Sequence, residues 1–156
     1  MYGNERLPGV ISSDVYRPEG SIWRGATEAT VFRVVPVGGT GAEASAIPLG
    51  TIMSEGADGK YALLTEAGII TSAASLPGAR VAVVADSTGK SGATVTENGA
   101  TVVKDGHVLV GIAGQVDEAR LLVGDKAWGD LTDEQRQGLR AQLEAWGLIP
   151  VPVVQA

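Results

Sequence analysis

Beyond residue 46, short apolar runs alternate with clusters of turn-forming residues. The runs are rich in β-branched residues, and turns recur roughly every ten residues, a spacing typical of antiparallel sandwiches and barrels. Asn98-Gly99 and Asp105-Gly106 are pairs that favour tight turns whose two central residues have positive φ. The pattern therefore predicts a β-rich domain with strands at Gly50–Met53, Lys60–Leu64, Ile69–Thr71, Arg80–Ala85, Thr101–Val103 and His107–Val116.

One segment near the C-terminus has a helical pattern instead, and we expect a helix over Asp133–Trp146. Thr132 and Gln135 have the spacing of a capping box, and Gly147 suits the left-handed residue that ends a helix. The apolar tail Leu148–Val154 is expected to be tucked against a surface. Within the helix, an apolar stripe repeats at i, i+4 and i+7 and consists of Leu139, Leu143 and Trp146. We expect this stripe to pack on the sheet or else on another subunit.

Residues 1–46 differ from the rest of the chain, because Pro and Gly recur too often for a helix of useful length. The strand candidate Thr30–Val37 contains Pro36, which cannot donate to a sheet ladder and therefore favours an edge position. Gly38–Gly41 is typical of a flexible joint. We expect an extended arm over 1–46 and a compact α+β, β-rich domain over 47–156. An isolated arm cannot bury its own apolar side chains, so we expect a partner protein to contact Ile22, Trp23, Val31, Phe32, Arg33, Val34 and Val35.

Composition narrows the possible functions. The chain has no cysteine, which excludes disulfides, thiol nucleophiles and cysteine-ligated zinc. Its formal net charge is −6 and its Lys and Arg residues are scattered, which argues against binding nucleic acid. No apolar run approaches the roughly 18 residues that a membrane helix needs, and no signal-peptide pattern opens the chain. We therefore expect synthesis in the cytoplasm and neither nucleic acid nor membrane as partner.

Two glycine-containing stretches have partial features of nucleotide sites. Gly39–Ala44 fits the pattern G-x-G-x-x-A, but Pro48 leaves too little room for the helix that a dinucleotide site requires. Gly89-Lys90-Ser91 resembles the end of a phosphate-binding loop, but the required first glycine is replaced by Val84. We therefore interpret the first stretch as a linker and the second as a surface turn, and expect no cofactor.

The remaining candidate groups do not form a complete catalytic or metal site. His107 is the only histidine, which excludes a site built from several histidines. Asp117 and Glu118 are a possible carboxylate pair for acid–base chemistry or Ca²⁺, but adjacent strand residues point to opposite faces. We therefore expect no catalytic residue, no metal and no enzymatic activity. An enzyme that uses Ser91, or the Asp117 and Glu118 pair, is the least supported alternative.

Two stretches of the chain resemble lambda-type phage head decoration proteins. Pro48–Met53 followed by Asp58–Tyr61 is similar to the opening of that family's compact domain, in which leucine-glycine-threonine, an aliphatic pair and glycine-lysine-tyrosine recur. Val110–Leu121 resembles the family's late strand, which ends in Glu-Ala-x-Leu before the terminal helix. The similarity covers roughly residues 46–150. The chain departs from the family pattern over Leu76–Gly92 and carries an extra turn over Gly92–Gly106.

The resemblance implies a homotrimer on the outer surface of the virion capsid, placed between capsomers at three-fold positions. The arm would lie on the major capsid protein, and the trimer would stabilise the expanded head against the pressure of packed DNA. Two alternatives remain open. One is another virion module, from the tail, fibre or baseplate. The other is a β-type module that binds a small molecule or carbohydrate. Such a module needs aromatic residues that converge on one site, whereas Trp23, Trp128 and Trp146 are far apart in the sequence.

Overall fold

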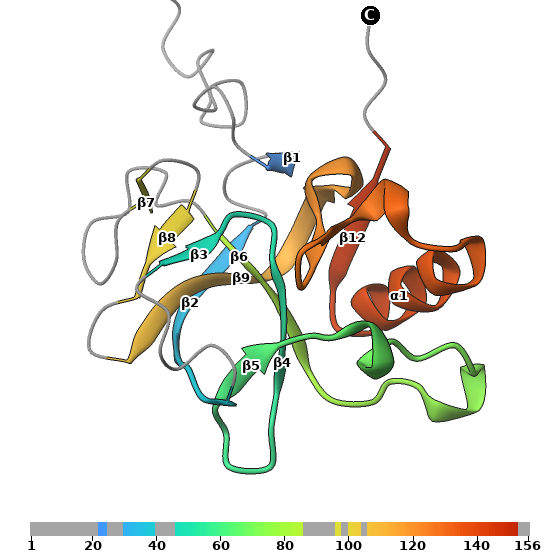
Figure 1. Ribbon diagram of the computed structural model, residues 1–156, viewed down its shortest axis with the longest axis horizontal. Helices are drawn as coiled ribbons and strands as arrows, with labels where there is room; N and C mark the ends of the chain where they lie inside the picture. Colours follow the sequence, from blue (N-terminus) through green and yellow to red (C-terminus); the bar gives the residue numbers. More distant parts are fainter. Residues whose placement is uncertain are drawn as a thin grey trace, which may run out of the picture.

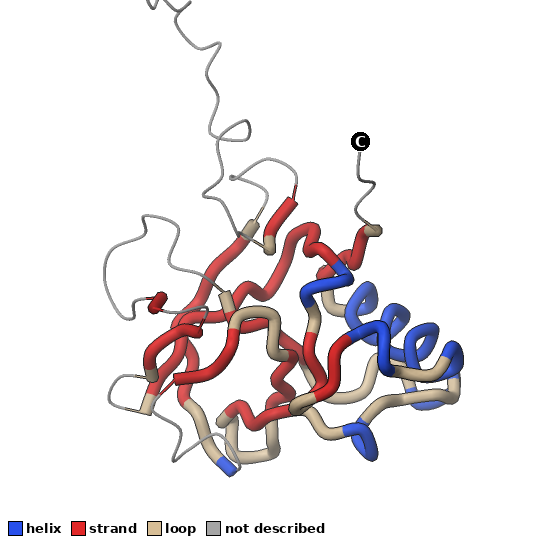
Figure 2. Tube along the Cα trace, turned by 45° about the horizontal axis from the view of Figure 1, so that its top comes forward, coloured by secondary structure: helices blue, strands red, loops and turns tan. Residues whose placement is uncertain are grey.

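The computed structural model describes residues 22–24, 30–39, 46–85, 96–97, 100–103 and 106–152. These residues form a seven-stranded, mainly antiparallel main sheet and two smaller sheets of three and two strands, with α1 (Asp133–Ala145) beside the main sheet near the C-terminus (Figure 1). In Figure 2 most of the strands lie on one side of the molecule and the helix lies on the other. The β-rich fold with a helix close to the C-terminus, predicted from the sequence, is confirmed.

The strands are mostly short, with β9 as the long exception. Short 3₁₀ turns at Glu66–Gly68, Ala73–Ser75, Glu118–Arg120 and Trp128–Asp130 connect several of them. The described strands are β1 (Trp23–Arg24), β2 (Val31–Pro36), β3 (Ala46–Pro48), β4 (Ile52–Glu55), β5 (Tyr61–Leu63), β6 (Val81–Val84), β7 (Thr96–Glu97), β8 (Ala100–Val102), β9 (His107–Asp117), β10 (Leu122–Val123), β11 (Lys126–Ala127) and β12 (Leu148–Val151).

Strand β9 organises the main sheet, because it pairs with four other strands. Gly111 of β9 lies opposite both Phe32 of β2 and Val83 of β6. Val116 lies opposite Trp23 of β1 and, in a parallel pairing, opposite the proline of β12. Neighbours therefore flank β9 on both sides along most of its length.

The sheet curls back on itself. From β9 it continues through β6 and β4 to β5, and the residue after β2, Val37, forms a bridge with Tyr61 of β5. The backbone N–H of Gly38 donates to the carbonyl of Tyr61 at 2.8 Å, and that of Val37 donates to the carbonyl of Gly106 at 2.8 Å. The end of β2 thereby meets the far edge of the sheet, which encloses an interior.

Two hydrophobic clusters result from this curled sheet, and β6 contributes to both. Val81 and Val83 pack in a cluster that includes Leu139 and Leu143 of α1. Their neighbours in sequence, Ala82 and Val84, point to the opposite face and pack with residues of β2, β4, β5 and β9. Because both of its faces are covered, β6 is a continuous apolar run rather than an alternating one.

The helix begins and ends where local sequence signals placed it, within one residue. The backbone N–H of Gln135 donates to Thr132 Oγ1 at 3.1 Å, and Gln135 Oε1 accepts from the N–H of Thr132 at 3.0 Å. This reciprocal pair is the predicted capping box. Gly147, just beyond the helix, has a φ of 90°, which a residue with a side chain rarely adopts.

The predicted strand at Ile69–Thr71 is wrong. That segment joins two 3₁₀ turns, and its backbone packs against α1 instead of a neighbouring strand: a Cβ added to Gly138 would lie 2.0 Å from the carbonyl oxygen of Ile70. The sequence did not predict β3, β7, the β10–β11 hairpin or β12 as strands.

The compact domain starts earlier in the chain than residue 46. Residues 22–24 and 30–39, which we expected to belong to a separate arm, supply β1 and β2 of the main sheet. Ile22 and Trp23 are completely buried. The rest of the expected arm, residues 1–21, 25–29 and 40–45, lies outside the described residues.

Candidate interaction surfaces

Strand β1 is held in place by a ring stacked on a glycine and by an ion pair. A Cβ added to Gly111 would lie 2.1 Å from the ring of Trp23, so only glycine leaves room for that ring. Phe32 meets Trp23 edge to face, with ring centroids 5.7 Å apart and an interplanar angle of 84°, a favourable aromatic geometry. Arg24 Nη2 donates to Asp117 Oδ2 at 3.0 Å. These contacts fasten the start of the described chain to β9.

Strand β2 has an open edge. It pairs with β9 over its whole length, and among the described residues its other side meets only the bridge from Val37 to Tyr61. Val31 and Val34 are 47% and 37% exposed, and Arg33 is also exposed. An edge strand that carries exposed apolar side chains can pair with a strand from another protein. We call the exposed side chains of Val31, Arg33 and Val34 the β2 edge.

The seven side chains expected to contact a partner thus divide into two groups. Ile22, Trp23 and Val35 are buried in the chain's own core, and Phe32 is half-buried against it. The chain's own core therefore buries Ile22, Trp23 and Val35, which seemed to need an external partner. Among these seven, only the residues of the β2 edge are exposed.

Tyr61 lies where β2 meets β5 and is almost fully buried. Burial raises the pKa of its phenol, and the nearby carboxylate of Glu55 raises this pKa further. The positive charges of Arg80 and Arg33 lower the pKa and partly oppose these effects. The phenol therefore stays protonated at neutral pH, so Tyr61 contributes an uncharged side chain to the closure of the sheet.

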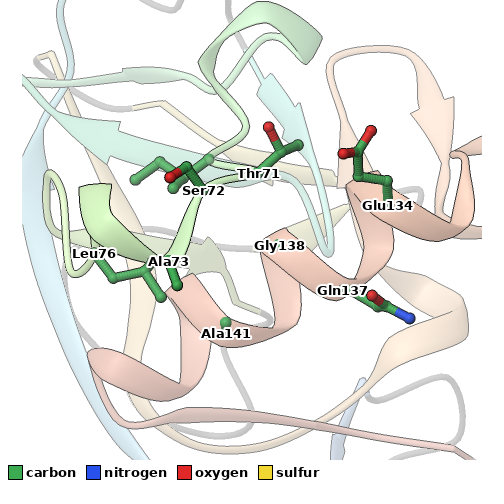
Figure 3. A pocket seen from close by; sticks show the side chains of 9 residues that line it. Thr71, Ser72, Ala73, Leu76, Glu134, Gln137, Gly138 and Ala141 are labelled. Atoms are coloured by element: carbon green, nitrogen blue, oxygen red, sulfur yellow. The ribbon is translucent and has the colours of Figure 1, made fainter.

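A second surface feature is a groove between α1 and the segment 70–76 (Figure 3). It has a volume of about 270 Å³. The helix approaches the loop closely here because Gly138 has no side chain and faces the carbonyl of Ile70. We call this feature the α1 groove; its lining consists of Ile70, Thr71, Ser72, Ala73, Leu76, Glu134, Gln137, Gly138 and Ala141.

The carboxylates considered for acid–base chemistry do not converge. Asp117 pairs with Arg24 and also accepts from the backbone N–H of Ala119 at 3.0 Å. Glu118 pairs instead with Arg140 at 2.8 Å. The two carboxylates therefore pair with different arginines. This separation was expected, because adjacent residues at the end of a strand point to opposite faces.

The other candidate groups yield no assembled chemical site. His107 is exposed at the first position of β9. Lys90 and Ser91 lie outside the described residues, as does most of Gly39–Ala44. Within the described part of the chain, no group of three or more His, Asp or Glu residues is arranged to hold a metal ion. No helix of that part is long and apolar enough to cross a membrane.

Sequence reasoning did not find the α1 groove. The one local signal was Gly138, a glycine in the interior of a helix, which often marks close packing against another backbone. On the other side of the groove, the segment Ile69–Thr71 was predicted as a strand. Comparison with protein families, with curated proteins and with solved structures finds no match to this chain.

Proposed function

We propose that this chain is a structural accessory protein of a tailed-phage head. It would bind the major capsid protein as a homotrimer on the outer surface of the expanded shell and stabilise the shell against the pressure of packed DNA. Two sequence stretches that resemble head decoration proteins support the family. The open, partly apolar β2 edge is the observation that carries the binding role.

The β2 edge suggests how the protein would attach. A strand of the capsid protein adding to β2 would satisfy the backbone groups on its outer side, and Val31, Arg33 and Val34 would supply side-chain specificity. Any ligand that binds only the expanded lattice stabilises that state by mass action. Because the sites repeat over the shell, modest affinity at each site is sufficient for a subunit that engages several of them.

Binding to purified expanded heads tests this proposal. The unmodified chain should sediment with expanded heads but not with unexpanded ones, and quantitative mass spectrometry of virions should find it in shell-scale abundance. A copy number of only a few per virion would favour a tail, fibre or baseplate module. Absence of the chain from virions would overturn the proposal.

A double variant tests whether heads bind the β2 edge specifically or bind any exposed apolar residue nonspecifically. Replacing Val31 and Val34 with aspartate places charges on exposed positions and should weaken head binding by at least tenfold while preserving the fold. Ile149 is 45% exposed on β12, so Ile149→Asp is a control of matched exposure and should bind normally. Equal loss in both variants would remove the β2 edge as the attachment surface.

A further inference from the structure

The α1 groove has two chemically different ends. Figure 3 shows Glu134 and Thr71 at the end near the start of the helix, whereas Leu76 and Ala141 lie toward the other end. Glu134 and Ala141 are seven positions apart on α1, which corresponds to about 10 Å at a rise of roughly 1.5 Å per residue. The groove is thus long enough for one extended side chain and part of the backbone that carries it.

The carboxylate of Glu134 has no ion-pair partner among the described residues, and no basic side chain lines the groove. Several other acidic groups around the helix are in ion pairs. Asp133 pairs with Arg136, Glu66 pairs with Lys126, and Glu118 pairs with Arg140. Glu134 is the one acidic residue among those that line the groove, so its carboxylate is the negative group there that can meet an external cation.

We propose that the α1 groove binds a lysine side chain presented on an extended segment of another protein. The apolar stem of lysine matches the surface formed by Leu76, Ala73 and Ala141, and its ammonium group matches the carboxylate of Glu134. Thr71, at the same end of the groove as Glu134, can accept a hydrogen bond from the same ammonium group. This surface is separate from the β2 edge, so the inference goes beyond the proposed attachment to the capsid.

Nuclear magnetic resonance titration of the full ¹⁵N-labelled chain provides the test. The probe is a capped pentapeptide with a central lysine flanked by alanines. Two further peptides carry norleucine, which has a similar stem without the ammonium group, or glutamate at the same position. The lysine peptide should shift the amide signals of segments 70–76 and 134–141 in a saturable manner, more weakly as salt is added. The other two peptides should not.

Three variants of the chain sharpen the result. Glu134→Gln should raise the dissociation constant of the lysine peptide roughly three- to fivefold, the size expected of a partly exposed ion pair. Glu144→Gln, on the same helix but outside the groove, should leave it unchanged. Ala73→Leu adds bulk at the apolar end without changing charge and should also weaken binding. The amide spectrum of each variant reports whether the fold is intact.

The proposal fails if the lysine peptide does not shift the groove residues. It also fails if norleucine binds as tightly as lysine, or if the two glutamate variants behave alike. None of these outcomes bears on head binding through the β2 edge, so the two proposals stand or fall separately.

Discussion

At the scale of single residues, the contact between Trp23 and Gly111 decides whether β1 belongs to the domain. A methyl group at position 111 would lie 2.1 Å from a rigid aromatic ring, and the ring is completely buried. Unlike the end of a flexible side chain, an indole in a packed core cannot move aside without displacing its neighbours.

We therefore expect Gly111→Ala to lower the free energy of unfolding by about 1–3 kcal/mol, the usual cost of overpacking a core. Urea unfolding followed by tryptophan fluorescence measures the change. Gly129→Ala is the control, because a Cβ added to Gly129 meets no atom within 4 Å. Equal stability of the two variants would contradict the close contact between the Trp23 ring and Gly111.

Glu66 connects three parts of the chain through one carboxylate. Its Oε2 accepts from Gln135 of α1 at 3.1 Å and from Lys126 of β11 at 3.2 Å. The hydrogen bond from Gln135 lowers the pKa of Glu66 most, and the hydrogen bond and charge of Lys126 lower it further. The carboxylate is thus favoured in its ionised form by the folded state.

The sign of the resulting pH effect follows from linkage. A folded-state pKa below the unfolded one adds stability that is fully present above the unfolded pKa, near 4.5, and is lost as pH falls through the lowered folded-state pKa. Glu66→Gln should therefore destabilise the protein at pH 7, and its difference from the unmodified chain should shrink as the pH falls below 4.5. Thermal unfolding between pH 3 and 7 tests this, with Glu144→Gln as the control. A difference that does not change with pH would contradict it.

At the scale of elements, α1 was predictable because its signals lie within a few residues of each other. The capping box needs only Thr132 and Gln135, and the apolar stripe needs only the helical repeat. Strand β12 was not predictable as a strand, because its pairing with β9 joins segments more than thirty residues apart and includes Pro150. A proline within a short run argues against a strand unless its partner is known.

The capping box carries a measurable part of the stability of α1. Thr132→Ala removes the oxygen that accepts from the N–H of Gln135, and we expect a loss of about 1 kcal/mol, typical for a cap. Thr71→Ala, at an exposed threonine in a loop, serves as the control and should change little. Chemical unfolding monitored by circular dichroism at 222 nm is the measurement. An unchanged midpoint for Thr132→Ala would show that the cap contributes nothing.

Replacing Gly138 of α1 with alanine would have two opposing effects on stability. Replacing a glycine inside a helix with alanine normally gains about 1 kcal/mol in helix propensity. Here the added methyl group would lie 2.0 Å from a backbone oxygen, and such a clash forces the loop away from the helix. We expect the clash to win, so that Gly138→Ala is net destabilising and disturbs the amide signals of segment 70–76. A stabilised variant would mean that the loop moves away freely.

At the scale of the whole molecule, the largest difference from the sequence-based expectation is the position of the domain boundary. Frequent Pro and Gly correctly indicated that residues 1–46 contain no long helix in their described part. They say nothing about which distant strand buries an apolar side chain. Ile22 and Trp23 are covered by β9, whose residues lie about ninety positions later. That pairing is set by the complete fold, and so is the α1 groove, whose two sides come from segments more than fifty residues apart.

Two truncations test the position of this domain boundary. Removing residues 1–21 deletes no described core residue, so we expect an unchanged urea midpoint. Removing residues 1–24 also deletes Ile22, Trp23 and the Arg24 ion pair, and the loss of one buried tryptophan alone costs about 3–5 kcal/mol. The longer truncation should therefore unfold far more easily or fail to fold. Equal stability of the two would place the start of the domain after residue 24, with β2 as its first strand.

The same truncations distinguish two routes of attachment to a phage head. If the segment before residue 22 makes the essential contact, removing residues 1–21 should abolish head binding while the folded domain persists. If the β2 edge makes it, this truncated chain should still bind, and only the Val31 and Val34 double variant should lose affinity. Because β2 remains intact when residues 1–21 are removed, the loss of binding can be assigned to one surface. Co-sedimentation with expanded heads, measured for both proteins at equal concentration, decides between the two routes.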